Sequence, residues 1–351
     1  MTYLLAGDIG GTNTRLRLVQ ASTLDLVKCQ EYSSPAYSDL AQIVREFLGA
    51  AQTEVGQVID VSVACFGIAG PIINRTCVTS NLGHWSIIAA DELQIVLNIP
   101  HVELINDFVA IGYGIPQLTP SDLYTLQIGK IQPNAPKATI GAGTGLGEGI
   151  LVHDGTEYLV LPTEGGHSDY AARSIREFEF VEYMCKKHEL DRLSYDRVVS
   201  GPGIVAFYQF LRDDPHRDVD KLPENPDVAS VVRLWESQTE KSANPAQLIS
   251  AMAIAKTNEL CETTMELFMA AYGAEAGNVA LNILAYGGLY LAGGIAAKNI
   301  PLLTDGTFLT AFNQKGRMKE LMGNMPIYVI LNPQVGLIGA VARAASLKLK
   351  M

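Results

Sequence analysis

Short apolar runs alternate with amphipathic segments over the first 110 residues. The runs near residues 3–7, 14–20, 60–66 and 101–105 predict strands. Apolar residues at helical spacing predict a helix over residues 40–51, and a second helix is predicted over residues 89–97, where Pro100 follows. This alternation of strands and helices predicts a layered α/β domain.

A second α/β region is predicted from about residue 111. Its expected strands lie at residues 138–140, 150–152, 289–292 and 327–331, and its expected helices at residues 171–188, 228–235 and 245–286. In the first of these helices, one apolar stripe is predicted to contain Ile175, Phe178, Val181 and Cys185. A final helix follows Pro333. The Ala-rich helices before Tyr286 suggest a homodimer interface, or they belong to the core.

The stretch from residue 276 to residue 297 contains no charged residue and is long enough to span a bilayer. It also contains Asn278, Asn282 and two glycine pairs. A buried helix followed by a buried strand explains this composition better, so no membrane partner is expected.

Composition narrows the functional classes. The chain has 351 residues, 48% of them hydrophobic, 18% charged, and a formal net charge of -11. This composition is globular, and the length favours two domains. The acidic balance and the lack of a basic run argue against a nucleic-acid partner. The five cysteines form no CxxC pair, and the first residues carry no signal-peptide pattern, so a reducing cytoplasm is expected.

The segment that joins the first two predicted strands is rich in glycine and short polar residues. Its candidate phosphate-binding residues are Gly7, Asp8, Ile9, Gly10, Gly11, Thr12 and Asn13. Backbone N–H groups of such a turn can point at anionic oxygens, and Asp8 can hold a magnesium ion, most simply through water. A glycine-rich hairpin without a ligand is the alternative.

Two further glycine loops follow predicted strands. Residues 141–149 repeat the strand, glycine turn and strand of the N-terminus, and two such loops suggest a nucleotide held between two similar halves. Neither loop is a Walker A motif or a dinucleotide-binding fingerprint. The late pair Gly293 and Gly294 suits an adenosine-facing loop, and a helix C-cap with a tight turn explains it equally well.

The predicted strand at residues 101–105 ends in Asn106 and Asp107. Ligands of open α/β sheets gather at the carboxyl ends of strands. A carboxylate at this place can accept the proton of an attacking hydroxyl, and the Asn106 amide can contact a neighbouring hydroxyl. In isolation, Asp107 is better explained as the N-cap of the next helix.

Other polar residues complete a set that suits a neutral polyol. Glu164 and His167, with two glycines between them, can grip adjacent hydroxyls, although a surface turn or part of a metal site is also compatible with this spacing. Asp196 can supply another acceptor, or it is a solvated helix charge paired with Arg192 or Arg197. Asn81 can add an amide.

Taken together, these motifs resemble the bacterial glucokinase family of the sugar kinase/Hsp70/actin superfamily. The resemblance runs nearly end to end. Its most specific parts are the loop at residues 7–13, residues 105–108, the glycine loop at 141–147, residues 164–167, and the Val-Ser-Gly-Pro-Gly motif at 199–203. The zinc motif of the related repressor/kinase group is absent, which places the chain with the zinc-independent members.

The resemblance implies roles for these residues. The first loop and Thr144, flanked by Gly143 and Gly145, would hold ATP phosphates, and Gly293 and Gly294 would lie near the adenosine. Asn106, Glu164 and His167 would bind glucose hydroxyls, and Asp107 would be the general base on the 6-hydroxyl. The family has Glu where this chain has Asp196, which puts that one contact in doubt.

The expected architecture is a two-domain α/β fold of the actin-like ATPase (ribonuclease H-like) type with an interdomain cleft. Residues 1–110 with 332–351 would form the small domain and residues 111–331 the large one, with glucose and Mg-ATP in the cleft. The expected reaction is ATP-dependent phosphorylation of glucose. The alternatives are a kinase for mannose, fructose or an amino sugar, a non-catalytic sugar sensor, and a chaperone-like ATPase.

Overall fold

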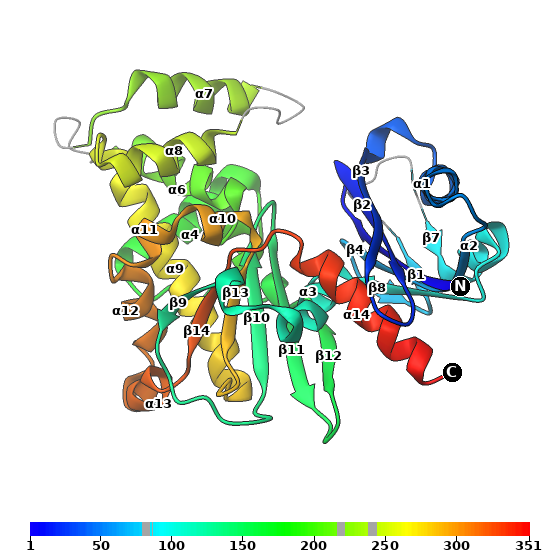
Figure 1. Cartoon of the computed structure of the whole chain (residues 1–351). Coiled ribbons are helices and arrows are strands. Elements are labelled where there is room, and N and C mark those ends of the chain that lie inside the picture. The colour runs from blue at the N-terminus through cyan, green and yellow to red at the C-terminus, as the bar shows by residue number, and fades with distance from the viewer. Residues whose placement is uncertain (79–84, 86, 216–221, 238–243) are drawn as a thin grey trace. The chain divides into compact units, whose positions relative to one another are not determined.

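The computed structural model describes residues 1–78, 85, 87–215, 222–237 and 244–351 (Figure 1). The chain forms two compact units. Unit 1 contains residues 1–123, 149–162 and 332–351, and unit 2 contains residues 124–148 and 163–331. The domain division expected from the sequence, at residues 110 and 332, stays a prediction. Residues 111–123 and 149–162 belong to the same compact unit as the N-terminal hairpin.

The sheet of unit 1 has the strand order β3–β2–β1–β4–β8. Strand β1 pairs antiparallel with β2 and parallel with β4, which pairs parallel with β8. Their bounds are β1 (Thr2–Ile9), β2 (Asn13–Gln20), β3 (Leu26–Ser33), β4 (Asp60–Ile68) and β8 (His101–Asn106). Four of the five were predicted. The exception is β3, in which only Tyr32 is buried, so its sequence carries no hydrophobic pattern.

Four α-helices belong to unit 1: α1 (Leu40–Val55), α2 (Ala90–Leu97), α3 (Asp107–Gly114) and α14 (Val335–Leu349). The smaller elements are η1 (Ser34–Ala36), β5 (Ile72–Ile73), β6 (Thr76–Cys77), β7 (Ile88–Ala89), η2 (Ile115–Gln117) and η3 (Pro120–Asp122). The predicted apolar face of α1 is buried, with Ile43, Val44 and Phe47 fully enclosed. Asp39 caps this helix by accepting from Gln42 N, and Gly56 ends it in the left-handed region.

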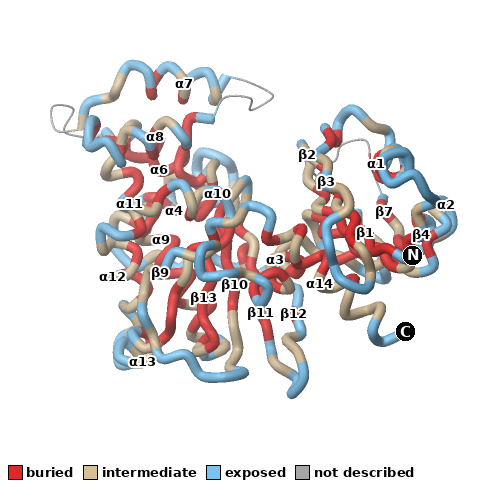
Figure 2. Tube along the Cα trace, in the orientation of Figure 1, coloured by how far each residue is buried: buried red, intermediate tan, exposed pale blue. Residues whose placement is uncertain are grey.

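The second sheet has the order β12–β11–β10–β13–β14–β9. Its strands are β9 (Leu123–Gln127), β10 (Lys137–Ala142), β11 (Leu146–His153), β12 (Tyr158–Thr163), β13 (Leu289–Ala292) and β14 (Ile327–Ile330). Within unit 2, β13 pairs parallel with both β10 and β14. All four residues of β13 are buried, as expected for a strand inside a parallel sheet (Figure 2).

Helices make up most of the rest of unit 2. They are η4 (Gly165–His167), α4 (Ile175–His188), α5 (Tyr195–Val198), α6 (Gly201–Asp213), α7 (Pro226–Ser237), α8 (Pro245–Ala255), α9 (Glu259–Ile283), α10 (Gly293–Lys298), α11 (Ile300–Leu303), α12 (Thr307–Asn313), η5 (Gly316–Met318) and α13 (Lys319–Gly323). Helix α9 is buried along much of its length. The apolar helices that suggested a homodimer therefore form core, and the homodimer stays a prediction without that support.

The predicted apolar face of α4 is wrong. Ile175 and Phe178 are 80% and 61% exposed, whereas Phe180 and Met184 are buried. The pattern misleads because the buried face also holds Glu177, whose charge is met by a bidentate ion pair with Arg173.

The uncharged stretch at residues 276–297 forms the end of α9, then β13, then the start of α10, as the sequence favoured. Within the described part of the chain, none of the helices combines the length and apolar character that crossing a bilayer requires.

Candidate active site

The N-terminal glycine loop is a tight hairpin in unit 1. The register pairs Asp8 with Arg15 and Ile9 with Thr14, and Gly10 N donates to Asn13 O at 2.9 Å. Neither Gly10 nor Gly11 lies in the left-handed region, and a Cβ on Gly10 would lie 3.1 Å from Asn13 O. A Cβ on Gly7 would lie 2.6 Å from the Phe66 ring.

The side chains of this hairpin differ in what they can offer a ligand. Ile9 is buried in the core, so only its backbone can face one, whereas Thr12 is exposed. The Asp8 carboxylate is about one-third exposed and lies 3.9 Å from Arg15. Partial burial raises the pKa of Asp8, and Arg15 opposes that shift. A carboxylate in this setting would gain stability from a nearby cation.

Ser34 hydrogen-bonds the backbone of the hairpin. The sequence did not predict this role. Ser34 is fully buried, its hydroxyl donates to Gly10 O at 2.8 Å and contacts Thr14 Oγ1 at 2.9 Å, and its N–H donates to Thr12 O at 2.9 Å. These contacts fix the loop backbone from the first residue of η1. No local motif marks Ser34, because its role depends on the pairing of β2 with β3.

Asn106, rather than Asp107, caps helix α3. The Asn106 Oδ1 accepts from Phe108 N at 2.8 Å and Val109 N at 3.4 Å, and its Nδ2 donates to Gly70 O at 3.1 Å. Asp107 is the first helical residue, so the prediction that it is the N-cap is wrong. Its partly exposed carboxylate lies at the helix N-terminus, which favours negative charge.

Two glycines allow α3 to lie close to its neighbours in unit 1. A Cβ on Gly67 of β4 would lie 2.9 Å from Ala110 Cβ, and one on Gly339 of α14 would lie 1.8 Å from Ala110 O. Strand β4 therefore supports the first turn of α3 directly beneath Asp107, and α14 supports its far side.

Parallel pairing brings the two predicted parts of unit 1 to one sheet edge. Ile9 of β1 lies in register with Ile68 of β4, which lies in register with Asn106 of β8. The glycine hairpin and Asp107 therefore follow strands that are separated only by β4.

Unit 2 brings its two glycine loops together in the same way. Gly141 of β10 pairs with Ala292 of β13, so the loop at residues 143–145 and the pair Gly293–Gly294 leave neighbouring strands at one edge. Gly293 has a φ of +84°, and a Cβ there would lie 2.6 Å from Ala142 O. These glycines begin helix α10, so their interpretation as a helix C-cap is wrong.

The motif at residues 199–203 holds the loop at residues 143–145 in place. Ser200 caps α6 by accepting from Gly203 N, and Gly201 N donates to Gly143 O at 2.8 Å. Asp196 is not an isolated surface charge, because its Oδ1 accepts from Leu146 N at 2.8 Å. A Cβ on Gly145 would lie 2.4 Å from the same oxygen.

Glu164 is the N-cap residue of the short helix η4, and His167 is the last residue of that helix. The Glu164 Oε2 and His167 Nε2 atoms are 3.9 Å apart, and both side chains are more than half exposed. The Arg192 Nη1 donates to His167 O and Asp169 Oδ1, each at 2.9 Å. Arg192 therefore fixes this turn, and is paired with Asp169 instead of Asp196.

A cavity of about 1070 Å³ in unit 2 brings several predicted residues to one place. Thr144, His167 and Asp196 line it together with Arg192 and Ser200, for which the sequence predicted no binding role. The cavity extends to Lys187, Gln209 and Glu236.

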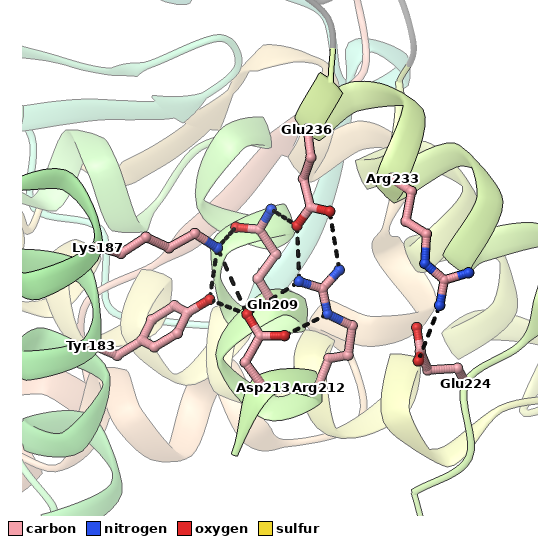
Figure 3. Close-up of polar contacts among 8 residues, drawn as sticks. All are labelled: Tyr183, Lys187, Gln209, Arg212, Asp213, Glu224, Arg233 and Glu236. Atoms are coloured by element: carbon pink, nitrogen blue, oxygen red, sulfur yellow. Dashed lines mark hydrogen bonds and ion pairs between the residues drawn. The ribbon is translucent and has the colours of Figure 1, made fainter. Parts of the chain in front are cut away.

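Figure 3 shows the polar network at Lys187, Gln209 and Glu236. The Lys187 ammonium group donates to Gln209 Oε1 at 2.9 Å and to Tyr183 OH at 2.7 Å, while Gln209 Nε2 donates to Glu236 Oε1 at 2.7 Å. Arg212 bridges Glu236 and Asp213. These side chains hydrogen-bond or ion-pair with one another, so we assign the network a structural role in lining the cavity. Asn81, the remaining predicted residue, lies outside the described residues.

Solved structures show which class of protein has this fold. A glucokinase from an Antarctic psychrotroph matches with a TM-score of 0.77 at 28% identity, over 99% of each chain. A ROK family glucokinase from Streptomyces griseus, solved with glucose and AMPPNP, matches with a TM-score of 0.64 at 16% identity over 98% of this chain and 99% of that one. The protein therefore has the two-domain actin-like ATPase fold, as the sequence predicted.

Sequence comparison narrows the class to a family. The glucokinase family model matches residues 5–347. The glucokinase of Nostoc punctiforme is 50% identical over 353 residues, which is 99% of this chain and all of that protein. The chain belongs to the glucokinase family, and it is an enzyme of that family.

Proposed function

We propose that the protein transfers the terminal phosphoryl group of ATP to the 6-hydroxyl of glucose, giving glucose 6-phosphate and ADP. One observation supports the assignment of this site to phosphoryl transfer. Within unit 1, the glycine hairpin and Asp107 follow strands at the same sheet edge, in the row formed by Ile9, Ile68 and Asn106. A phosphate-binding turn and a carboxylate at such an edge suit phosphoryl transfer, which depends mainly on positioning and charge stabilisation.

Asp107 acts as the general base. As the 6-hydroxyl oxygen attacks the terminal phosphorus, its proton passes to the Asp107 carboxylate, and the bond from that phosphorus to the ADP oxygen breaks. The position of Asp107 at the first residue of α3 supports this role, since it follows a strand at the same sheet edge as the phosphate-binding turn.

Unit 1 would bind the phosphates through the backbone of residues 7–13, and unit 2 through the loop at Gly143, Thr144 and Gly145. Asp8 would hold Mg²⁺ through water. Its environment fits this role, because partial burial raises the pKa of the carboxyl group and a bound cation would stabilise its charged form. When bound, the cation neutralises phosphate charge. Gly293 and Gly294 would lie against the adenosine.

Glucose hydroxyls would be held by Asn106, Glu164, His167 and Asp196. The Asn106 Oδ1 is already occupied by the α3 cap, so its Nδ2, which has a second hydrogen, would serve the sugar. Two carboxylates and one imidazole offer hydrogen-bond acceptors, which suit the hydroxyls of a neutral sugar.

The test is ADP release from Mg-ATP with a panel of hexoses and a blank without sugar. We expect turnover that depends on glucose, and we expect Asp107→Asn to lower kcat about 10²- to 10⁴-fold, the usual contribution of a general base. Asp60→Asn is the matched control, because Asp60 is exposed at the opposite end of β4.

The other outcomes are equally informative. Preference for mannose, fructose or an amino sugar would reassign the substrate. ADP release without sugar would indicate a chaperone-like ATPase, and near-wild-type turnover by Asp107→Asn would remove Asp107 from the mechanism.

A further inference from the structure

Unit 2 contains a buried pair of acids that the proposed reaction does not use. Glu148 of β11 and Glu275 of α9 are 6% and 5% exposed, and their carboxyl groups are within hydrogen-bonding reach of each other. The Glu148 Oε1 atom is buried and meets no donor among the described residues. Two adjacent buried carboxylates cannot both carry a charge at low cost, and a proton on one of them supplies the missing donor.

Glu148 lies directly against the turn proposed to bind the sugar. A Cβ on Gly165 would lie 2.1 Å from Glu148 Oε2, and one on Gly166 would lie 2.2 Å from Leu146 O. The two glycines therefore pack on β11 at positions two residues apart. Glu164 and His167 flank these glycines, so any shift of the Glu148 carboxyl would move both.

Glu275 connects the pair to the element that carries Asp196. Asn278 bridges the two residues, because its Nδ2 donates to Glu275 Oε2 at 2.8 Å and to Tyr195 OH at 3.2 Å. Tyr195 is 3% exposed and immediately precedes Asp196 on α5. Close packing of Gly165 on Glu148 and the Asn278 bridge from Glu275 to Tyr195 thus connect the turn and α5 to the two acids.

Two cationic side chains act on this pair and its neighbours. The Lys315 ammonium group donates to Asn278 Oδ1 and to Ala274 O at 2.9 Å, and it acts on Glu275 from that side. Arg173 acts on Tyr195 and Lys315 from the segment before α4. Lys315 favours ionisation of Glu275, which makes Glu148 the acid that keeps the proton.

We propose that Glu148 and Glu275 share one proton in a buried hydrogen bond that positions the turn at residues 164–167 against α5. They are positioning residues for the sugar site. The inference rests on the proposed sugar-binding role of Glu164, His167 and Asp196.

The sign of the pH dependence follows from the pair. Burial and the neighbouring Glu275 raise the pKa of Glu148 to about 8, and burial raises that of Glu275. The proton is therefore held at neutral pH and lost as the pH rises through about 8. Above that pH two buried carboxylates repel each other, and the stability and sugar affinity that depend on the hydrogen bond are lost.

The experiment compares the wild-type enzyme with Glu148→Gln, whose amide donates to Glu275 at any pH. We expect the wild-type Kd for glucose, measured by calorimetry without nucleotide, to rise about fivefold between about pH 7 and about pH 9, towards the roughly tenfold limit that a one-unit pKa difference between free and bound protein sets. In Glu148→Gln this alkaline loss should be absent. Glu148→Ala should bind glucose weakly at both pH values.

The matched control is Glu177→Gln. Glu177 is another buried acid of unit 2, but it is paired with Arg173 and not with a carboxyl group. We expect it to lower stability to urea without removing the alkaline loss. An alkaline loss of equal size in Glu148→Gln and the wild type would overturn the proposal, because the pair would then not set sugar affinity.

Two measurements need no sugar. The wild type should show the infrared band of a protonated carboxyl group at neutral pH, and Glu148→Gln should lack it. Amide exchange at residues 167–168 should accelerate beyond its intrinsic base dependence above about pH 8 in the wild type alone. If no hexose binds, the proposed function fails, and these two readouts still decide the shared proton and its effect on the turn.

Discussion

At the scale of single residues, the Asp196 carboxylate combines a structural hydrogen bond with a proposed sugar contact. Its Oδ1 already accepts from Leu146 N, which is buried, and this leaves Oδ2 for a sugar hydroxyl. Asp196 therefore already has a structural contact to the glycine loop of unit 2. A structural role and a binding role can be separated by substitution.

We predict that Asp196→Asn keeps the bond to Leu146 N and stays within about 0.5 kcal/mol of wild-type stability. It should raise the KM for glucose about tenfold, because a hydrogen bond to a charged acceptor contributes roughly 1.5–3 kcal/mol. Asp196→Ala should in addition lose about 1–3 kcal/mol of stability, since Leu146 N is left unsatisfied. Urea unfolding and glucose titrations measure both, and an unchanged KM in Asp196→Asn would leave Asp196 a purely structural role.

The pair Gly293 and Gly294 offers a second comparison. Gly293→Ala places a Cβ 2.6 Å from Ala142 O in a left-handed backbone, whereas a Cβ on Gly294 meets nothing within 4 Å. We predict that Gly293→Ala lowers stability by at least about 1 kcal/mol and weakens ATP binding. Gly294→Ala should fold normally, so a rise in its KM for ATP would indicate a nucleotide contact. Equal stability of the two variants would contradict this account.

At the scale of elements, the packing of α3 on α14 is set by backbone contact. A Cβ on Gly339 would lie 1.8 Å from Ala110 O and 2.5 Å from Gly114 N, and a Cβ on Gly114 would lie 2.2 Å from Val335 O. No side chain separates the two helices at these points, so the position of α3, and of Asp107 at its start, depends on α14.

We predict that Gly339→Ala destabilises the protein by about 1–3 kcal/mol or more, the range for overpacking. The control is Gly49→Ala, at an exposed position of α1 where a Cβ meets nothing within 4 Å; it should stabilise by about 0.5–1 kcal/mol. Thermal unfolding of both variants tests this. A neutral Gly339→Ala would mean that α14 can move away from α3 at little cost.

Elements with a regular apolar pattern were predictable from the sequence, and those whose burial depends on polar partners were not. The strand ends that carry the glycine hairpin and Asp107 follow from runs of buried residues. The inner face of α4 could not be predicted, because Glu177 is buried only through Arg173. Likewise, Ser34 and the Glu148–Glu275 pair join segments far apart in sequence, and no local spacing reveals them.

At the scale of the whole molecule, unit 1 is assembled from three separate stretches of the chain. The last of them contributes α14, which packs on α3, β1 and β4. The first stretch therefore lacks a complete core without it.

We predict that a chain truncated after Pro333 loses cooperative unfolding and glucose-dependent turnover, because the apolar face of α14 no longer covers the sheet. Deleting only Met351, which is 73% exposed, is the control and should leave both unchanged. Differential scanning calorimetry and the ADP-release assay measure the effect. A truncated chain with a wild-type transition would show that unit 1 folds without its last helix.

The same discontinuity has a consequence for synthesis. Strand β1 is translated about 330 residues before α14, so at ribosomal rates of about 5–20 residues per second it waits roughly 20–70 seconds for that helix. During that interval the face of the sheet that α14 covers is open, while most of unit 2 is already outside the ribosome. A nascent chain of this protein should therefore be a client of chaperones until its last residues emerge.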